Sequence, residues 1–390
     1  MNRAAKPTRA LLFSLLAGSL AIVCGFRLGD IFTQSDAGSY LLMAQGRSAD
    51  VLQPFLSRQL LPLLVRLLAH AHIGVQSAFI AIGILSIFVL LFMVGMLLET
   101  CSPRILVAVG CIPFWAILFE GLVLPDLFHG ALLGIMLWLL LREKYVLAAL
   151  MFFPLEVARE STLLALLIYL VVMKSSRILA AVSTIAGAIT VRLLLPAVPH
   201  NREHTGMLAY MAGKTVWNFA KNILGFPLTI PSNANNCTTP RWTLSHGIGV
   251  CQFNLSLPFH TLRIALTLFG LFPLCAALVW RKTRSRFLRF CFTYGAAAFI
   301  LAPILGSSLP RLFGYSWPLM LIAVPVLIEE LGVSVKFLVV HLALAWSCVL
   351  QPSVQSATAE LCATALIALI YFYFLREWKR RPNNSLAPTQ

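Results

Sequence analysis

Runs of about 20 consecutive apolar residues recur along this chain, and they limit its possible folds more than any other feature. Each run is long enough to cross a bilayer as a helix. Inside lipid the backbone must satisfy its own hydrogen bonds, so only helices or a closed barrel can span it. Barrel strands alternate apolar and polar residues, whereas these runs are continuously apolar. The sequence therefore predicts an all-α protein, a polytopic bundle of transmembrane helices.

The distribution of charge gives this bundle an orientation. Only 11% of the residues are charged, yet the formal net charge is +16. On a soluble chain that excess would suggest nucleic-acid binding. Here the basic residues gather in alternate loops, which is the positive-inside pattern. The basic loops and tails lie near Arg104, Arg142, Lys174, 281–289, Lys336 and 376–381. We therefore expect a multi-pass protein of the bacterial inner membrane with cytoplasmic amino and carboxyl termini.

About 10–12 spans are expected. The first, 10–26, follows Arg3, Lys6 and Arg9 and is interpreted as an uncleaved helix rather than a signal peptide. The others are expected near 75–98, 105–118, 127–141, 145–153, 162–173, 178–198, 262–280, 287–305, 318–328, 337–350 and 361–375. Residues 1–381 then form a single transmembrane domain, and the polar tail 382–390 is expected to be disordered.

Two of the expected outward loops are long. The first, 27–73, is predicted to hold two amphipathic helices at the membrane surface, near 39–46 and 56–72. The second covers 199–260 and contains Cys237 and Cys251. In an oxidising periplasm these two cysteines are able to form a disulfide, but their spacing alone leaves that question open.

Acidic residues are scarce, with 14 in the chain. Most fall in the expected outward loops: Asp30, Asp36, Asp50, Glu120, Asp126, Glu156, Glu160, Glu203 and Glu360. Ionisable groups beside apolar spans are costly and often mark function. The outward face is therefore where we expect a site.

Asp36 is the first candidate. It begins the segment Asp36-Ala-Gly-Ser-Tyr40, which is followed by a second polar segment around Arg58. A carboxylate there can accept a proton from an acceptor hydroxyl or bind a divalent metal beside a phosphate. The alternative is a structural role, because Asp is a common helix N-cap.

Four acids, a histidine and an arginine near the middle of the chain form two further candidates. Glu120 and Asp126 lie close in sequence, and Asp126 and His129 are three residues apart, which places them on one helix face. They suit metal binding or the orientation of a base, but taken alone the pattern favours capping by Asp126, with His129 as a polar interfacial residue. Glu156, Arg159 and Glu160 interrupt an apolar stretch, where ion pairing as a structural device competes with catalysis.

Arginines supply the remaining candidates. Arg58 is expected at the start of the second surface helix, Arg192 near the outer end of a span and Arg311 in a late outward loop. Their planar guanidinium groups suit phosphate oxygens. An isolated outward arginine more often extends to lipid headgroups, so each of these has a structural alternative.

Taken together, these features resemble the GT-C superfamily of polytopic membrane glycosyltransferases. The shared features are an acid and two surface helices in the first outward loop, acids in the second, and a late outward loop with an arginine. The motif residues are Asp36-x-x-x-Tyr40, Arg58, Glu120, Asp126 and Arg311. A paired Asp-x-Asp is absent.

The resemblance implies a chemistry and a set of roles. Such enzymes use a sugar carried on polyprenyl phosphate and act on the outer side of the membrane. Asp36 would be the catalytic carboxylate, Glu120 and Asp126 the second acidic site, and Arg311 with Arg58 the phosphate ligands. Tyr40, Arg159, Glu160 and Tyr315 are further candidates for substrate binding. Mg²⁺ or Mn²⁺ would be held by Asp36, Asp126 and His129.

The predicted function is thus transfer of a sugar to an envelope glycan, lipid or protein on the periplasmic side. A transporter or flippase of a lipid-linked or anionic intermediate is the alternative. That class predicts internal repeats and charges at the bilayer midplane, whereas here the acids gather at one face. A non-catalytic scaffold is a third reading. The sequence contains no phosphate-binding glycine loop and no nucleotide fingerprint, which disfavours an ATP-driven machine.

Overall fold

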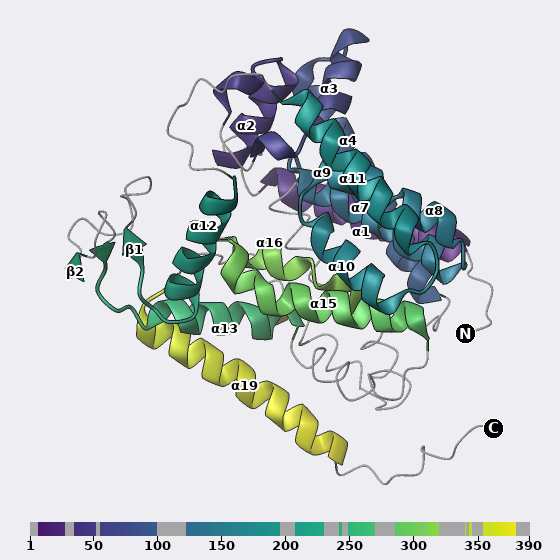
Figure 1. Ribbon diagram of the computed structural model, residues 1–390. Coiled ribbons are helices and arrows are strands. Elements are labelled where there is room, and N and C mark those ends of the chain that lie inside the picture. The colour runs from purple at the N-terminus through teal and green to yellow at the C-terminus, as the bar shows by residue number, and fades with distance from the viewer. Residues whose placement is uncertain are drawn as a thin grey trace, which may run out of the picture. The chain divides into compact units, whose positions relative to one another are not determined.

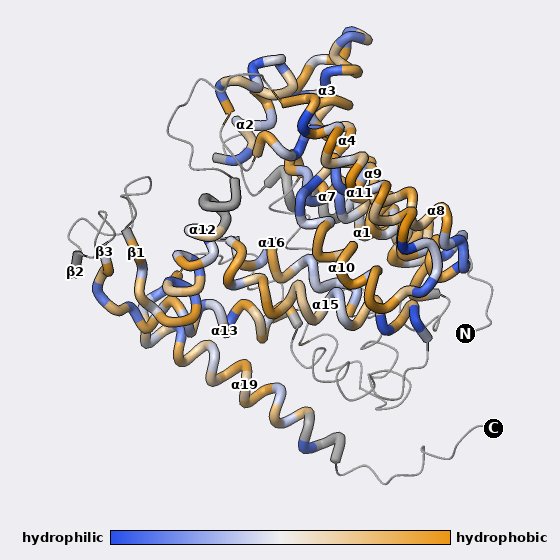
Figure 2. The backbone as a smooth tube through the Cα atoms, viewed as in Figure 1, coloured by the Kyte–Doolittle hydropathy of each residue, from blue (hydrophilic) through white to orange (hydrophobic). Residues whose placement is uncertain are grey.

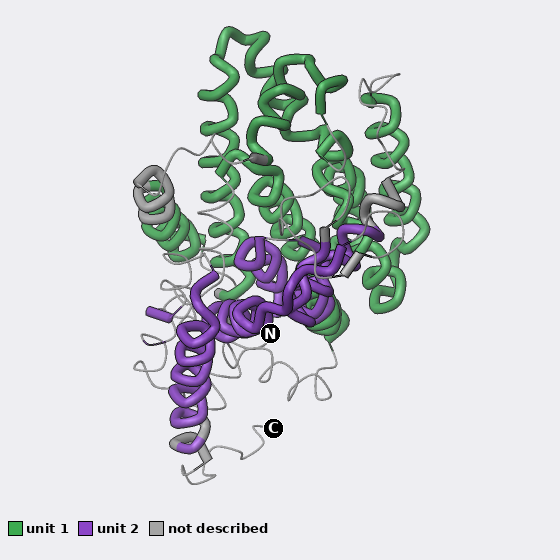
Figure 3. Tube along the Cα trace, turned by 90° about the vertical axis from the view of Figure 1, so that its left-hand side faces the viewer, with its two compact units in different colours: residues 1–110, 114–207, 280–294 green, residues 111–113, 208–279, 295–390 purple. Residues whose placement is uncertain are grey.

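The computed structural model describes twelve stretches of the chain. They are residues 7–27, 35–51, 55–99, 122–195, 207–229, 242–243, 249–269, 285–306, 308–319, 340, 343–344 and 354–379. Within them the fold is all-α, apart from three strands of two residues each (Figure 1). The chain forms two compact units, drawn in different colours in Figure 3. Unit 1 holds residues 1–110, 114–207 and 280–294, and unit 2 holds 111–113, 208–279 and 295–390.

Four helices are long and apolar enough to cross a membrane, so the prediction of a multi-pass membrane protein is supported. They are α4 (Val75–Glu99), α11 (Arg177–Leu194), α15 (Arg286–Leu305) and α19 (Ala357–Lys379). Figure 2 shows α4 and α11 as largely hydrophobic along their length. The expected spans near 105–118, 318–328 and 337–350 lie wholly or mostly outside the described residues, as does the tail 382–390. The number of 10–12 spans therefore stays a prediction.

Unit 1 is built around α4, which packs against α1 (Pro7–Arg27) on one side and α7 (Pro125–Leu141) on another. Small residues bring α1 and α4 together. A Cβ placed on Gly95 would lie only 3.0 Å from the Cβ of Ala10, so the two backbones approach closely there. Nearby, the Ser14 hydroxyl donates a 2.7 Å hydrogen bond to the Phe88 carbonyl. Close backbones and interhelical hydrogen bonds are typical of helix pairs in membranes.

Short helices occupy the segment where surface helices are predicted. They are α2 (Ser35–Ala44), the 3-10 turns η1 (Ser48–Asp50) and η2 (Phe55–Ser57), and α3 (Leu60–His70). Two polar side chains of this segment, Gln59 and Arg66, bond to backbone carbonyls within it. The Arg66 guanidinium donates a 2.6 Å hydrogen bond to the Met43 carbonyl, and the Gln59 amide donates one to the Leu56 carbonyl. The two helices thus pack on each other.

The helical path after α7 is interrupted at Met151 and again at Arg159. The span expected at 145–153 is divided into α8 (Tyr145–Leu150) and α9 (Phe152–Ala158). Pro154 explains this break, because it has no N–H to donate to the carbonyl four residues earlier. Arg159 is extended, and α10 (Thr162–Val172) follows. Helix α11 lies close to α9, since a Cβ added to Gly187 of α11 would be 2.9 Å from the Glu156 Cβ of α9.

Unit 2 contains α12 (Met207–Asn222) and a small antiparallel sheet in the order β1-β3-β2. The strands are β1 (Leu228–Thr229), β2 (Trp242–Thr243) and β3 (Gly249–Val250). The segment 199–260, predicted as a large outward loop, thus contains regular secondary structure. The Trp217 indole on α12 donates a 2.7 Å hydrogen bond to the Leu228 carbonyl and so fixes β1 to the helix. Cys251 is disulfide-bonded, whereas Cys237 lies outside the described residues.

Besides α12, the described helices of unit 2 are α13 (Ser256–Phe269), the latter part of α15, α16 (Leu309–Gly314) and α19, with the 3-10 turn η5 (Trp317–Leu319). Helix α13 packs on α19 and on α16. The Asn222 amide at the end of α12 donates a 2.8 Å hydrogen bond to the Pro303 carbonyl of α15. Because Asn222 is buried, this bond holds the end of α12 against α15.

Candidate functional site

Arg58, placed between η2 and α3, forms the centre of a buried polar site in unit 1. Its guanidinium faces Glu160, with Nη2 2.5 Å from Oε1 and Nε 3.0 Å from Oε2. The remaining nitrogen, Nη1, donates a 2.8 Å hydrogen bond to the Tyr40 hydroxyl. The Arg58 side chain is 8% exposed and that of Glu160 is 19% exposed. The pair is therefore a bidentate, charge-assisted contact that solvent reaches mainly from the Glu160 side.

A second ion pair adjoins the first. Arg159, the residue before Glu160, pairs with Asp126 in the first turn of α7. Both are buried, and the Asp126 side chain is only 1% exposed. Helix α7 and the α9–α10 junction are thus joined by opposite charges. A buried pair of this kind is strongly destabilised when one partner is removed.

His129 lies one turn after Asp126 on α7 and is also buried. Its Nε2 is 3.1 Å from the Thr162 hydroxyl, and that hydroxyl donates a 2.8 Å hydrogen bond to the Arg159 carbonyl. A hydroxyl has one proton to donate, so His129 Nε2 is assigned as the donor to Thr162. We name Tyr40, Arg58, Asp126, His129, Arg159, Glu160 and Thr162 the charged cluster.

Asp36 lies near the charged cluster along α2. It is in the first turn of that helix, and Tyr40 follows four residues later on the same face. Tyr40 is buried, contacts Arg58 and meets the Phe55 ring edge-on at 5.9 Å between ring centroids. Asp36 itself is half-buried. The hydrogen bond from Arg58 to Tyr40 therefore fixes the helix that carries Asp36.

The electrostatics of the Arg58–Glu160 pair follow from burial and charge. Burial favours the neutral form of Glu160, but the adjacent Arg58 guanidinium outweighs it and lowers the pKa of Glu160 to about 2. Burial raises the pKa of the Tyr40 hydroxyl, and the Arg58 charge opposes that rise only in part. At neutral pH the site holds an ionised Glu160 and a neutral Tyr40.

Glu120, Arg311, Tyr315 and Arg192 are the other residues expected at the site. Glu120 lies outside the described residues. Arg311 and Tyr315 belong to unit 2, where Arg311 is within α16 and Tyr315 is buried directly after it. Arg192 is in the last turn of α11. Their expected roles stay predictions.

The predicted metal ligands do not come together as a set. The described residues contain no group of three or more His, Cys, Asp or Glu side chains that is suited to a metal ion. Asp126 faces the Arg159 guanidinium, so a cation there would meet a like charge. His129 contacts Thr162, and Asp36 is on a different helix. The described donors do not fit Mg²⁺ or Mn²⁺, and no step below uses a metal.

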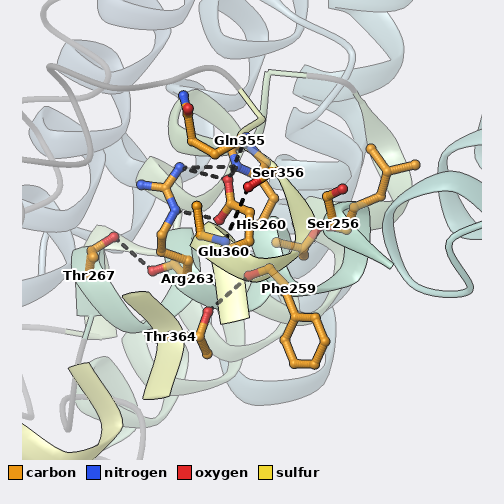
Figure 4. Close-up of polar contacts among 12 residues, drawn as sticks. Ser256, Phe259, His260, Arg263, Thr267, Gln355, Ser356, Glu360 and Thr364 are labelled. Carbon is orange, nitrogen blue, oxygen red and sulfur yellow. Dashed lines mark hydrogen bonds and ion pairs between the residues drawn. The ribbon is translucent and has the colours of Figure 1, made fainter. Parts of the chain in front are cut away.

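Unit 2 contains a separate polar cluster that was not predicted, formed by His260 and Arg263 of α13 and Glu360 of α19 (Figure 4). Arg263 Nε donates to Glu360 Oε2 at 2.6 Å, and the Gln355 backbone N–H donates to Oε1 at 2.9 Å. His260 Nδ1 lies 3.0 Å from Oε1. Glu360 is fully buried, so the cluster holds α13 against the first turn of α19. The sequence signal is the three-residue spacing of His260 and Arg263.

No protein-family model, curated protein or solved structure matches this chain. The site must therefore be interpreted from its own geometry. Its chemistry is that of a buried, charge-balanced cluster beside a helix carrying a half-buried carboxylate, Asp36. Such a site is able to accept a proton at Asp36 and to bind an anion at an arginine once the carboxylate partner moves away.

Proposed function

We propose that this chain is a membrane glycosyltransferase, located in the bacterial inner membrane with both termini cytoplasmic. It would transfer a sugar from a polyprenyl-phosphate donor to an envelope glycan, lipid or protein on the periplasmic side. The observation that supports this most is the charged cluster, which gathers two arginines and two carboxylates among apolar helices. Ionisable groups in such surroundings are costly and are usually functional. The resemblance of the first outward loop to GT-C enzymes supplies the class of reaction.

In the proposed reaction the acceptor hydroxyl oxygen attacks the anomeric carbon of the donor sugar. The bond between that carbon and the phosphate oxygen breaks, and its electron pair leaves with the phosphate. The hydroxyl proton passes to the Asp36 carboxylate, which acts as general base. Arg58 is a positioning residue for Asp36 in this scheme, because it holds Tyr40 on the same face of α2.

The Arg58 guanidinium is also a candidate binding group for the donor phosphate. Phosphate and carboxylate oxygens both accept paired N–H bonds from a guanidinium, so a phosphate can take the place of Glu160. Glu160 is the more exposed member of the pair, which leaves this exchange accessible to a ligand. Arg159, paired with the deeper Asp126, would keep the surrounding helices in place during the exchange.

The test compares two carboxylates of the same segment. Asp36→Asn should abolish sugar transfer and leave the protein level unchanged. Asp50→Asn is the matched control, because Asp50 is partly exposed and pairs with Arg47 at the surface. Both variants are returned to a deletion strain, and its lipid-linked sugars are analysed.

Three outcomes are informative. Accumulation of a polyprenyl-phosphate sugar in the deletion strain and with Asp36→Asn, but not with Asp50→Asn, supports transfer. Full transfer activity of Asp36→Asn rejects the catalytic role of Asp36. Accumulation of an intermediate that faces the cytoplasm favours the flippase alternative instead.

A further inference from the structure

A shallow surface cavity of about 610 Å³, open on one side, lies at the turn between α10 and α11, and no residue of the charged cluster lines it. Its lining is Lys174, Ser176, Arg177, Ile178, Leu179 and Val182. Lys174 and Ser176 come from the turn, and Arg177 begins α11. The apolar side chains come from the first two turns of α11. A ligand that fills this cavity must carry a polar or charged end and an apolar part.

No carboxylate among the described residues neutralises the two cations of this cavity, Lys174 and Arg177. Arg177 Nε donates to the Met173 carbonyl and Nη2 donates to the Val171 carbonyl at 3.2 Å. Carbonyls hold the guanidinium in place without cancelling its charge. Across the described part of the chain, no ion pair includes Lys174 or Arg177. Arg58, Arg159 and Arg263, by contrast, each bind a carboxylate.

An apolar stripe continues from the cavity along α11. Its residues are Ile178, Val182, Ile185, Ile189 and Leu193, each more than half exposed. They recur at intervals of three or four residues, so they lie on one face of the helix. The stripe covers about 22 Å at 1.5 Å per residue. Because α11 is long and apolar enough to cross a membrane, acyl chains are the natural contact for this face.

We propose that the cavity binds one anionic phospholipid. Lys174, Ser176 and Arg177 hold its phosphodiester headgroup, and an acyl chain lies along Ile178, Val182 and Ile185. The uncancelled charge of the two cations selects an anionic headgroup over a zwitterionic one. The site is independent of the proposed transferase activity, because it shares no residue with the charged cluster.

The experiment measures lipid retention by native mass spectrometry. The full-length chain is purified in neutral detergent and titrated with phosphatidylglycerol or phosphatidylcholine. A basic side chain near an anionic lipid contributes about fivefold in affinity. Lys174→Gln should therefore weaken phosphatidylglycerol binding about fivefold, and the double variant with Arg177→Gln about 25-fold. Phosphatidylcholine retention should not change.

Arg286→Gln is the matched control, because Arg286 is an exposed cation at the start of another long apolar helix. Arg286→Gln should leave the affinity for the most tightly bound phosphatidylglycerol molecule unchanged. Arg177 also binds backbone carbonyls, so Lys174→Gln alone decides the outcome if the double variant does not fold. Equal retention of both lipids by the wild type, or an equal loss with Arg286→Gln, overturns the proposal. Release of the lipid by millimolar inorganic phosphate would show that headgroup chemistry without the acyl chain suffices, and would overturn the lipid assignment.

Discussion

Replacing Glu160 with glutamine tests whether the Arg58–Glu160 pair stabilises unit 1. The change keeps the size of the side chain and one carbonyl acceptor but removes the negative charge opposite a buried guanidinium. A pKa lowered from 4.5 to about 2 corresponds to roughly 3 kcal/mol of stabilisation at neutral pH. Removal of one partner of a buried pair typically costs about 3–5 kcal/mol, which is consistent. We expect Glu160→Gln to lower the free energy of unfolding by about 3 kcal/mol.

The sign of the pH dependence follows from the lowered pKa. The stabilisation from Glu160 is complete above its unfolded pKa of 4.5 and is lost as the pH falls toward 2. The difference in stability between wild type and Glu160→Gln should therefore shrink as the pH falls below 4.5. Comparing the two proteins at each pH isolates Glu160 from the other acids that titrate in the same range.

The assay is unfolding of the purified protein in detergent, followed by circular dichroism over a denaturant series at several pH values. Asp50→Asn is the control, since exposed pairs such as Arg47–Asp50 contribute less than about 1 kcal/mol. The reasoning is refuted if both variants cost the same, or if the wild-type advantage over Glu160→Gln persists unchanged down to pH 3.

Three further changes test other buried contacts by the same unfolding assay. Tyr40→Phe removes the buried 2.8 Å hydrogen bond from Arg58 and should cost about 1–2 kcal/mol, whereas the partly exposed Tyr145→Phe should cost little. Gly187→Ala places a Cβ 2.9 Å from the Glu156 Cβ and 3.0 Å from the Phe153 carbonyl oxygen, so it should lower the free energy of unfolding by about 1–3 kcal/mol. Gly213→Ala is its control, because the added Cβ meets nothing within 4 Å, and it should be neutral or stabilising. Glu360→Gln leaves Arg263 buried without a carboxylate and should cost about 3–5 kcal/mol, and a loss below 1 kcal/mol would contradict that role.

Local patterns predicted the membrane-spanning character well, because span length and hydropathy are properties of consecutive residues. The helices of the first polar segment were also predictable, with α2 and α3 close to their expected positions. The span predicted to end at Phe153 ended too early, because a proline is tolerated in the first turn of a helix and α9 continues through Pro154 to Ala158. The interruption between α8 and α9 at Met151 was not predicted. Helix α12 was missed because its polar residues and flanking turn residues suggested a loop.

Pairing at the charged cluster was predictable only in part. The isolated charges at 156–160 indicated that Arg159 would meet a carboxylate, and the structure confirms this. The identity of the partners was not predictable, because Arg58 and Glu160 are 102 residues apart and periodicity carries no information across that separation. The same reasoning applies to Arg263 and Glu360, which are 97 residues apart.

Whether an arginine has a structural or a ligand-binding role is indicated better by the groups it contacts than by its position in the sequence. A guanidinium facing a buried carboxylate, as in Arg159–Asp126, is already compensated, so an incoming anion must displace a charge to bind there. Arg58 is the intermediate case, because its partner Glu160 retains some exposure and can be exchanged. Arg177 is bound only by neutral carbonyls among its described contacts and keeps its full charge for a ligand. On this reasoning a mutation at Arg159 acts mainly through stability, whereas one at Lys174 beside Arg177 acts mainly through binding, and a double measurement of unfolding and lipid retention distinguishes the two.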